Sequence, residues 1–160
     1  MIGIEEFIQS TKGQSLLEGF EPQDLERLAE LAKEVHFKSD QIVFREGENH
    51  GRFYLILDGS VVLEITAGGR PVSLQTLHAG DAMGWSSLVE AEGGAHFAAR
   101  VVSPARALSF EGARLRETCE SDPAFGYRMM KALLTLVTER LDASRMQLVD
   151  MYAKPGVARA

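Results

Sequence analysis

The sequence predicts an α+β fold in which short antiparallel strands lie between two helical segments. Apolar residues recur every three or four positions up to about residue 32, and again from about residue 111 to 152, as in amphipathic helices. Between these segments, residues 35–110 form short alternating runs interrupted by glycines, the pattern of strands joined by tight turns. Many such strands favour a sandwich, a barrel or a roll, and periodicity alone leaves all three open.

The individual elements follow from local signals. Helical spacing with a proline suited to the first turn predicts a helix over residues 22–32. Asp58-Gly59 separates two apolar runs and predicts a β-hairpin turn. The glycine-rich residues 67–71 and the segment 78–81 predict two further turns, with a strand between them.

The C-terminal segment predicts one long helix. Asp122 suits the N-cap and Pro123 the first helical position. An alternating four-three spacing then gives the seam of a coiled coil, at Met130, Leu134, Val137, Leu141, Ser144, Leu148 and Met151. The seam predicts a homodimer, and a helix packed on its own domain is the alternative. We expect residues 1–121 to form one unit, residues 122–153 the long helix, and residues 154–160 a frayed tail.

Composition argues against several classes of function. With 45% hydrophobic and 25% charged residues, the 160-residue chain is typical of a globular domain. A single cysteine excludes an intrachain disulfide framework. The chain has no signal-peptide pattern at its start and no apolar stretch of membrane-spanning length, so we expect a cytoplasmic protein without membrane contact. The net charge of −6 argues against general nucleic-acid binding.

Catalytic and metal-binding patterns are not visible in the sequence. The four histidines are scattered without ligand-like spacing, and no Ser-His-Asp or Cys-His constellation, nucleotide-binding glycine-rich loop or Walker motif occurs. We therefore expect no enzyme activity, no metal and no resident cofactor. A small-molecule ligand of unknown identity stays open.

Several motifs together resemble one known family. These are Ile-Val-Phe-Arg-Glu-Gly-Glu at residues 42–48, Phe-Tyr-Leu-Ile-Leu-Asp-Gly-Ser-Val at residues 53–61, and Gly-Asp-Ala-Met-Gly-Trp-Ser-Ser-Leu-Val at residues 80–89. Over about residues 15–152 the chain resembles the cyclic nucleotide-binding domains of the catabolite activator protein and Fnr group. The resemblance implies an antiparallel β-roll, like a double-stranded jelly roll, flanked by N-terminal helices and a long C-terminal dimerisation helix.

The phosphate-binding cassette at residues 80–89 departs from the family pattern. The resemblance places a glutamate at position 85 and an arginine at position 97, where this chain has Trp85 and Phe97. In relatives that bind cyclic nucleotides, that glutamate accepts from the ribose hydroxyl and that arginine pairs with the phosphate. An indole only donates, and a phenyl ring carries no charge. The missing pairings amount to roughly 4–8 kcal/mol, or about three to five decades of affinity.

The resemblance also implies which residues line a ligand site. They are Gly84, Trp85, Ser86, Ser87, Phe97, Ala98 and Ser144. Gly84 lets the backbone approach a phosphate, and the two serines cap a short helix or bind an anion. Trp85 fills the pocket or stacks on an aromatic ligand. Ser144 contacts a purine or is simply a small residue where two helices cross.

Strand alternation decides which side chains face this pocket. Period two places Phe97, Ala99 and Val101 on one face of the strand, and His96 and Arg100 on the other. If Ala99 corresponds to the family's alanine, Phe97 faces the pocket. A slip of one residue would instead bring His96 and Arg100 inside.

These observations predict a non-enzymatic regulatory or sensor domain, dimeric and acting on an unknown protein partner, that does not bind cyclic AMP or cyclic GMP in the usual way. Two alternatives stay open: a genuine cyclic nucleotide-binding signalling protein, and a ligandless dimeric scaffold. In the transcription factors of this group a helix-turn-helix domain follows the long helix. The sequence ends soon after that helix, so we expect no nucleic-acid binding by this chain alone.

Overall fold

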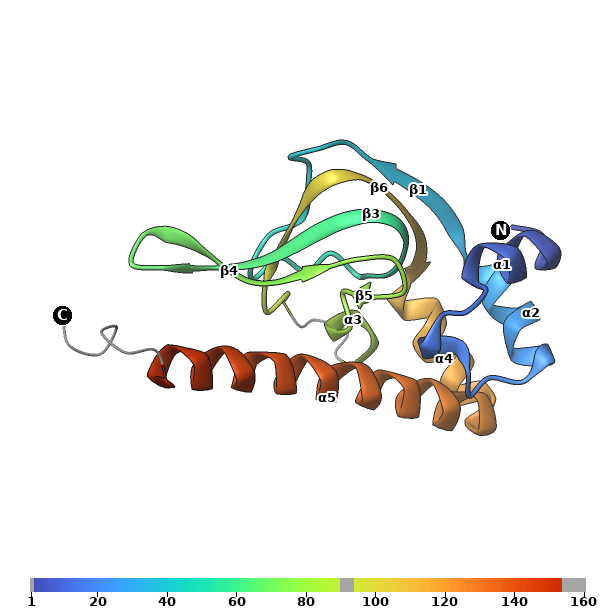
Figure 1. Ribbon diagram of the computed structural model, residues 1–160. Coiled ribbons are helices and arrows are strands. Elements are labelled where there is room, and N and C mark those ends of the chain that lie inside the picture. The colour runs from blue at the N-terminus through green and yellow to red at the C-terminus, as the bar shows by residue number, and fades with distance from the viewer. Residues whose placement is uncertain (1, 90–93, 154–160) are drawn as a thin grey trace.

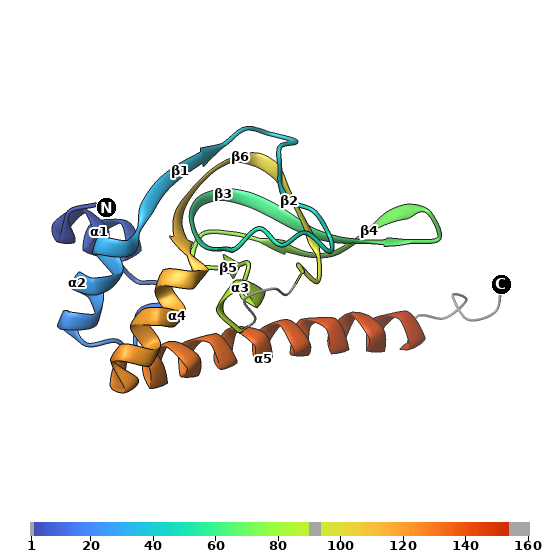
Figure 2. The same cartoon turned by 180° about the vertical axis from the view of Figure 1, so that it is seen from behind.

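The structure, a computed structural model, describes residues 2–89 and 94–153. It is an antiparallel β-roll with helices at one end and a long helix beneath it (Figures 1 and 2). The helices are α1 (Ile4–Thr11), the 3-10 helix η1 (Ser15–Leu17), α2 (Pro22–Leu31), α3 (Ser86–Val89), α4 (Gly112–Ser121) and α5 (Pro123–Ala153). The strands are β1 (Lys33–Phe37), β2 (Ile42–Phe44), β3 (Arg52–Ala67), β4 (Arg70–Leu77), β5 (Ala82–Met83) and β6 (Ala98–Glu111). The predicted fold class is confirmed; the tail expected to fray lies outside the described residues.

Two long strands hold the roll together. All pairs are antiparallel in the order β1-β6-β3-β4, with β2 also pairing with β6 and β5 with β3. β3 and β6 run side by side from Arg52 opposite Glu111 to Glu64 opposite Ala98. Because the shorter strands pair with different parts of β3 and β6, these two strands belong to both halves of the roll.

The hairpin predicted at Asp58-Gly59 is wrong. β3 runs through both residues and pairs with β6 on either side of them, with shifts in register around Asp58. Gly59 has φ of 86°, and a Cβ there would lie 2.3 Å from the Pro104 carbonyl oxygen. The glycine therefore allows an irregular step within a continuous strand, where β3 and β6 approach closely. The other two predicted turns are confirmed, one between β3 and β4 and one between β4 and β5.

Side chains on the two faces of β3 enter different apolar clusters. Phe53 and Leu55 pack with buried residues of α1, α2, α4 and α5. Tyr54 and Ile56, on the opposite face, pack inside the roll. One cluster thus fixes the helices to the sheet, and the other fills the interior beside the cassette.

Two ion pairs tie α2 to the start of α5. Asp24, only 2% exposed, accepts from Arg128 at 2.5 Å, and Asp122 accepts from Arg27 at 2.7 Å. The Phe125 amide also donates to Asp122, which confirms the predicted N-cap. Within the described ranges, none of the helices combines the length and apolar character needed to cross a membrane.

Candidate functional site

The cassette lies where the roll meets α5, and its central turn depends on glycine. β5 pairs with β3, and the chain then turns at Gly84 with φ of 82°. A Cβ at Gly84 would lie 2.3 Å from the Arg52 carbonyl oxygen and 3.0 Å from Cε1 of His50. Packing against β3 therefore requires glycine at this position whether or not a ligand binds.

The His50 side chain packs against the turn at Gly84. Its ring stacks on Phe44 with centroids 4.2 Å apart and planes 8° from parallel, and its Nδ1 accepts from the Arg52 amide at 3.2 Å. Burial lowers the pKa of His50, so the ring is neutral near pH 7. A neutral imidazole that already accepts through Nδ1 is a packing group here.

The space enclosed by the cassette is almost filled. The empty cavity is about 10 Å³, room for a single water at most. Its walls are Phe44, Leu63, Met83, Gly84, Trp85, Ser86, Ala95, His96, Phe97 and Arg140. The half-buried ring of Trp85 stacks on the exposed His96, with centroids 5.0 Å apart and planes 10° from parallel. Both rings of this aromatic pair belong to the cavity wall.

The two serines of α3 have different surroundings. Ser86 is buried and lines the cavity. Ser87 is also buried but does not line the cavity. Its hydroxyl donates to the Gly84 carbonyl at 2.7 Å, and its own carbonyl accepts from Arg116 of α4. The Ser87 hydroxyl is thus a donor inside the turn rather than an N-cap acceptor, which is one of the two roles expected from the sequence.

Within β6, the alternation matches the expectation from the sequence. The expected place of His96 is wrong: it precedes the strand and lines the cavity instead of facing away with Arg100. Ala99 and Val101 are fully buried, and Phe97 lines the cavity on the same side. Arg100 faces the other way, where its Nε donates to Glu64 at 3.0 Å, and this pairing raises the pKa of Arg100. Ala98 pairs with Glu64 in the sheet and is not part of the cavity wall. The alternative register, with Arg100 inside, is therefore wrong.

Arg140 of α5 is a cavity residue that the sequence reasoning missed. It is 8% exposed, and its Nε and Nη2 are buried without a hydrogen-bond partner in the described part of the chain. The sequence signal that could have identified Arg140 is a second apolar stripe on α5. Its buried residues precede Arg140 at helical spacing and are Phe125, Met129, Leu133 and Leu136. Arg140 continues that stripe, so it had to point inward.

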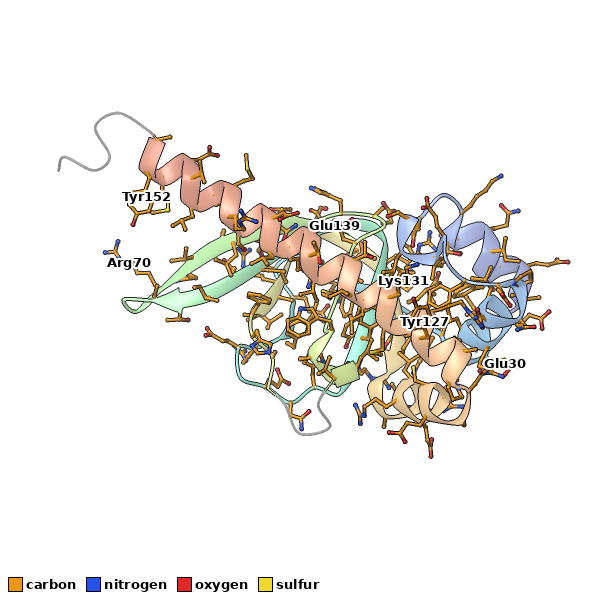
Figure 3. All side chains as sticks on the ribbon, turned by 90° about the horizontal axis from the view of Figure 1, so that it is seen from below. Glu30, Arg70, Tyr127, Lys131, Glu139 and Tyr152 are labelled. Carbon is orange, nitrogen blue, oxygen red and sulfur yellow. The ribbon has the colours of Figure 1, made fainter. Side chains whose placement is uncertain are left out.

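The predicted seam lies on a different face of α5. Leu134 and Leu141 are 67% and 58% exposed, and Met130, Leu148 and Met151 are exposed as well, while Val137 is half-buried. Ser144 is exposed and does not reach the cavity of its own chain. Figure 3 shows α5 from below, with Tyr127 and Tyr152 towards its two ends. One face of the helix thus packs on its own domain while the seam stays free.

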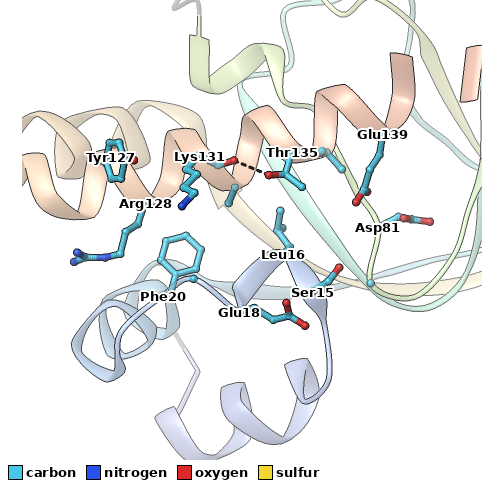
Figure 4. A pocket seen from close by; sticks show the side chains of 14 residues that line it. Ser15, Leu16, Glu18, Phe20, Asp81, Tyr127, Arg128, Lys131, Thr135 and Glu139 are labelled. Carbon is cyan, nitrogen blue, oxygen red and sulfur yellow. Dashed lines mark hydrogen bonds between the residues drawn. The ribbon is translucent and has the colours of Figure 1, made fainter. Parts of the chain in front are cut away.

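A larger hollow of about 420 Å³ lies beside α5, apart from the cassette cavity (Figure 4). It lies between the η1 segment with Leu16 and Phe20, the turn at Asp81, and a flank of α5 with Lys131 and Glu139. Its charges are mixed and spread along its length. In the described residues, no group of three His, Cys, Asp or Glu side chains is placed to hold a metal ion.

A family model described as the cyclic nucleotide-binding domain matches residues 34–122. No curated protein matches the chain. Among solved structures, the chain is similar to a candidate cyclic nucleotide-binding protein from Geobacter metallireducens GS-15, with 26% identity and a TM-score of 0.74, covering 88% of this chain and 99% of that one.

Two further structures share the fold. A cyclic nucleotide-binding domain from Methylobacillus flagellatus KT has 18% identity and a TM-score of 0.79, covering 92% of this chain and 83% of that one. The regulatory subunit of a cAMP-independent protein kinase A from Trypanosoma brucei, a triply substituted variant bound to cAMP in its A site, has 18% identity and a TM-score of 0.75. The match covers 92% of this chain and 51% of that one.

Proposed function

The chain belongs to the family of cyclic nucleotide-binding domains, and from that premise we propose that it is a non-enzymatic regulatory domain that does not bind cyclic AMP or cyclic GMP in the usual way. The observation that carries the proposal is the cassette cavity of about 10 Å³. Trp85 and Phe97 occupy space on its walls, at the two positions where the family pattern has a carboxylate and a cation. A nucleotide has neither room nor its expected partners.

The nearest cation on β6 cannot substitute for the missing arginine. Arg100 lies on the outer face and is engaged by Glu64 and Asp40. Leaving those carboxylates to reach the cavity would require the strand to slip, which would reverse the buried positions Ala99 and Val101. Among solved structures of this fold, the Trypanosoma brucei subunit belongs to a protein kinase A described as cAMP-independent, and its substituted variant is described as bound to cAMP. That precedent supports a version of this fold that works without cyclic AMP.

Calorimetry with cyclic AMP and cyclic GMP tests the proposal. We expect dissociation constants weaker than about ten micromolar for both nucleotides. Tighter binding of either one would favour the runner-up function, a genuine cyclic nucleotide-binding signalling protein.

A double variant, Trp85→Glu with Phe97→Arg, tests the cause. It restores the carboxylate and the cation together, which avoids leaving one new charge unpaired. We expect a partial gain in nucleotide affinity over the wild-type protein. A folded double variant without any gain would assign the loss of binding to the backbone rather than to these two side chains.

We further propose that the protein acts as a homodimer through the seam of α5. A parallel pair about a twofold axis would bury the exposed leucines and methionines against their own copies. Leu141→Asp places two like charges in that contact, so we expect a monomer by light scattering with an unchanged β-sheet signal in circular dichroism. A wild-type protein that is already monomeric at about a hundred micromolar would contradict the dimer.

The dimer could transmit a ligand signal to a protein partner or serve only as a ligandless scaffold. A thermal-shift screen of nucleotides and common metabolites separates these two, because a ligand that binds the native state raises the melting temperature. We favour the sensor because Nε and Nη2 of Arg140 are buried beside the cavity and have no hydrogen-bond partner among the described residues.

A further inference from the structure

Arg140 presents an unused pair of donors to the cassette cavity. Its Nε and Nη2, both buried and unpartnered within the described residues, are the two adjacent N–H groups that match the two oxygens of a carboxylate or phosphate. Burial lowers the pKa of Arg140 to about 10, and the charge of Asp81 opposes this effect. The guanidinium therefore remains charged near pH 7.

Three other arginines of the chain show the usual arrangement. Arg27, Arg100 and Arg128 each donate to a carboxylate at 3.0 Å or less. The charge of Asp81 raises the pKa of Arg140, but the Asp81 carboxylate accepts a hydrogen bond from the His78 amide and none from Arg140. A buried donor without an acceptor is costly, and a charged one more so. A single water in the remaining cavity would satisfy one donor and leave the charge unbalanced.

Most of the rest of the cavity wall is apolar, with Ser86 and His96 as the polar exceptions. Phe44, Leu63, Met83 and Phe97 face the space into which Arg140 points. One cation at the end of an apolar wall complements an anion that carries an apolar body, and it complements a fully hydrated inorganic anion poorly. Trp85 lines the same space and is half-buried beside the exposed His96, and it packs against the cluster that fixes the helices rather than against the interior of the roll. Its ring can therefore leave without unpacking the interior of the roll.

We propose that Arg140 anchors a small organic carboxylate with an aromatic or short aliphatic body, which enters the cassette cavity in place of the Trp85 ring. The carboxylate oxygens accept from Nε and Nη2, and the apolar body lies against Phe44, Leu63 and Phe97. The inference rests on the proposed function, since it names the class of ligand that replaces a cyclic nucleotide in the same site.

Fluorescence of Trp85 tests the inference directly, because it is the only tryptophan in the chain. The full-length protein is titrated with benzoate, butyrate, acetate and inorganic phosphate, each against sodium chloride at equal ionic strength, with melting temperature as a second readout. We expect benzoate or butyrate to shift the emission to longer wavelength in a saturable way and to raise the melting temperature. Acetate and phosphate should act about tenfold more weakly or not at all.

Three variants identify the anchoring group. Arg140→Met should abolish the response and, because it removes an unpaired buried charge, should not lower the melting temperature of the ligand-free protein. Arg140→Lys keeps the charge but loses the paired donors, so the response should weaken. Arg145→Gln removes an exposed arginine from the same helix and should respond like the wild type.

Several outcomes would overturn the inference. These are no response beyond that of sodium chloride, an equal response in wild type and Arg140→Met, or a phosphate response as strong as that of benzoate. A marked loss of stability in Arg140→Met without ligand would also overturn it, since the guanidinium would then be paired in solution. Tight binding of cyclic AMP in the same assay would instead contradict the proposed function, so the two failures are distinguishable.

Discussion

The two halves of α5 have the same secondary structure but different surroundings. In residues 123–140 one face is buried against the sheet and the other helices, and the ion pair of Arg128 with Asp24 links this half to α2. A second ion pair joins Asp122, just before the helix, to Arg27 of α2. In residues 141–153 no side chain is buried. Large apolar residues are exposed there, namely Leu141, Met146, Leu148, Val149, Met151 and Tyr152. The first half is a structural part of its own domain, whereas the second half exposes a large apolar surface that no described part of the chain covers.

The largest effect is expected from removing an aromatic ring of the first half. Phe125 is fully buried, packs on Phe20 with centroids 6.0 Å apart and lies under the Arg27 guanidinium. Phe125→Ala should lower the free energy of unfolding by about 3–5 kcal/mol in urea titrations. Its counterpart in the second half, Tyr152→Ala, removes a ring that is 78% exposed and should change the stability of the monomer by less than about 0.5 kcal/mol. Similar losses for both would erase the contrast between the halves.

A smaller effect is expected from the ion pair that holds the first half. Arg128 lowers the pKa of Asp24, mainly through its hydrogen bonds. The contribution of Asp24 to stability is therefore fully present above the ordinary aspartate pKa and is lost as the pH falls through the lowered value. Asp24→Asn should lower the urea midpoint at pH 7, by less than Phe125→Ala does. The difference from the wild type should shrink below about pH 4. A constant difference across that range would mean that the carboxylate charge has no part in the link.

The smallest effect should come from the second half. Gln147 donates to the Leu74 carbonyl of β4 at 2.5 Å, a contact between this half and the roll. Since the side chain is exposed, Gln147→Ala should change the free energy of unfolding by less than about 0.5 kcal/mol. A loss comparable to that of Asp24→Asn would show that the second half is docked on its own domain. The exposed seam would then no longer support a contact with a second copy of the chain.

Local signals in the sequence predicted most of the fold. The cassette glycines, the N-cap at Asp122 and the alternation around Ala99 each follow from short-range geometry, and the structure agrees with all three. The pair Asp58-Gly59 misled because glycine at positive φ serves a strand irregularity as well as a turn. Only the approach of Pro104 from β6 decides between them. Such long-range contacts leave no local trace.

The candidate site was predictable where it lies on β6 and the cassette, and not where it depends on α5. Trp85 and Phe97 stand at positions that the family pattern identifies, and both line the cavity. Arg140 belongs to neither the pattern used nor the seam. The chain has two apolar stripes on α5, and the more regular one is the exposed seam rather than the buried stripe that Arg140 continues. The role of Ser87 depends on the Gly84 carbonyl direction, which sequence alone does not give.

The shared long strands also bear on how quickly the chain can reach this structure. β3 and β4 are joined by a tight turn, so their ladder can form early from neighbouring residues. The ladder between β3 and β6 cannot: it joins residues as distant as Arg52 and Glu111, and the cassette segment must be looped out between them. Closing such a loop costs entropy before its contacts compensate, so folding should proceed in milliseconds to seconds rather than microseconds. Before β6 pairs with β3, the backbone hydrogen-bonding groups on that edge of β3 are unpaired. The newly made chain is most prone to aggregation during this interval.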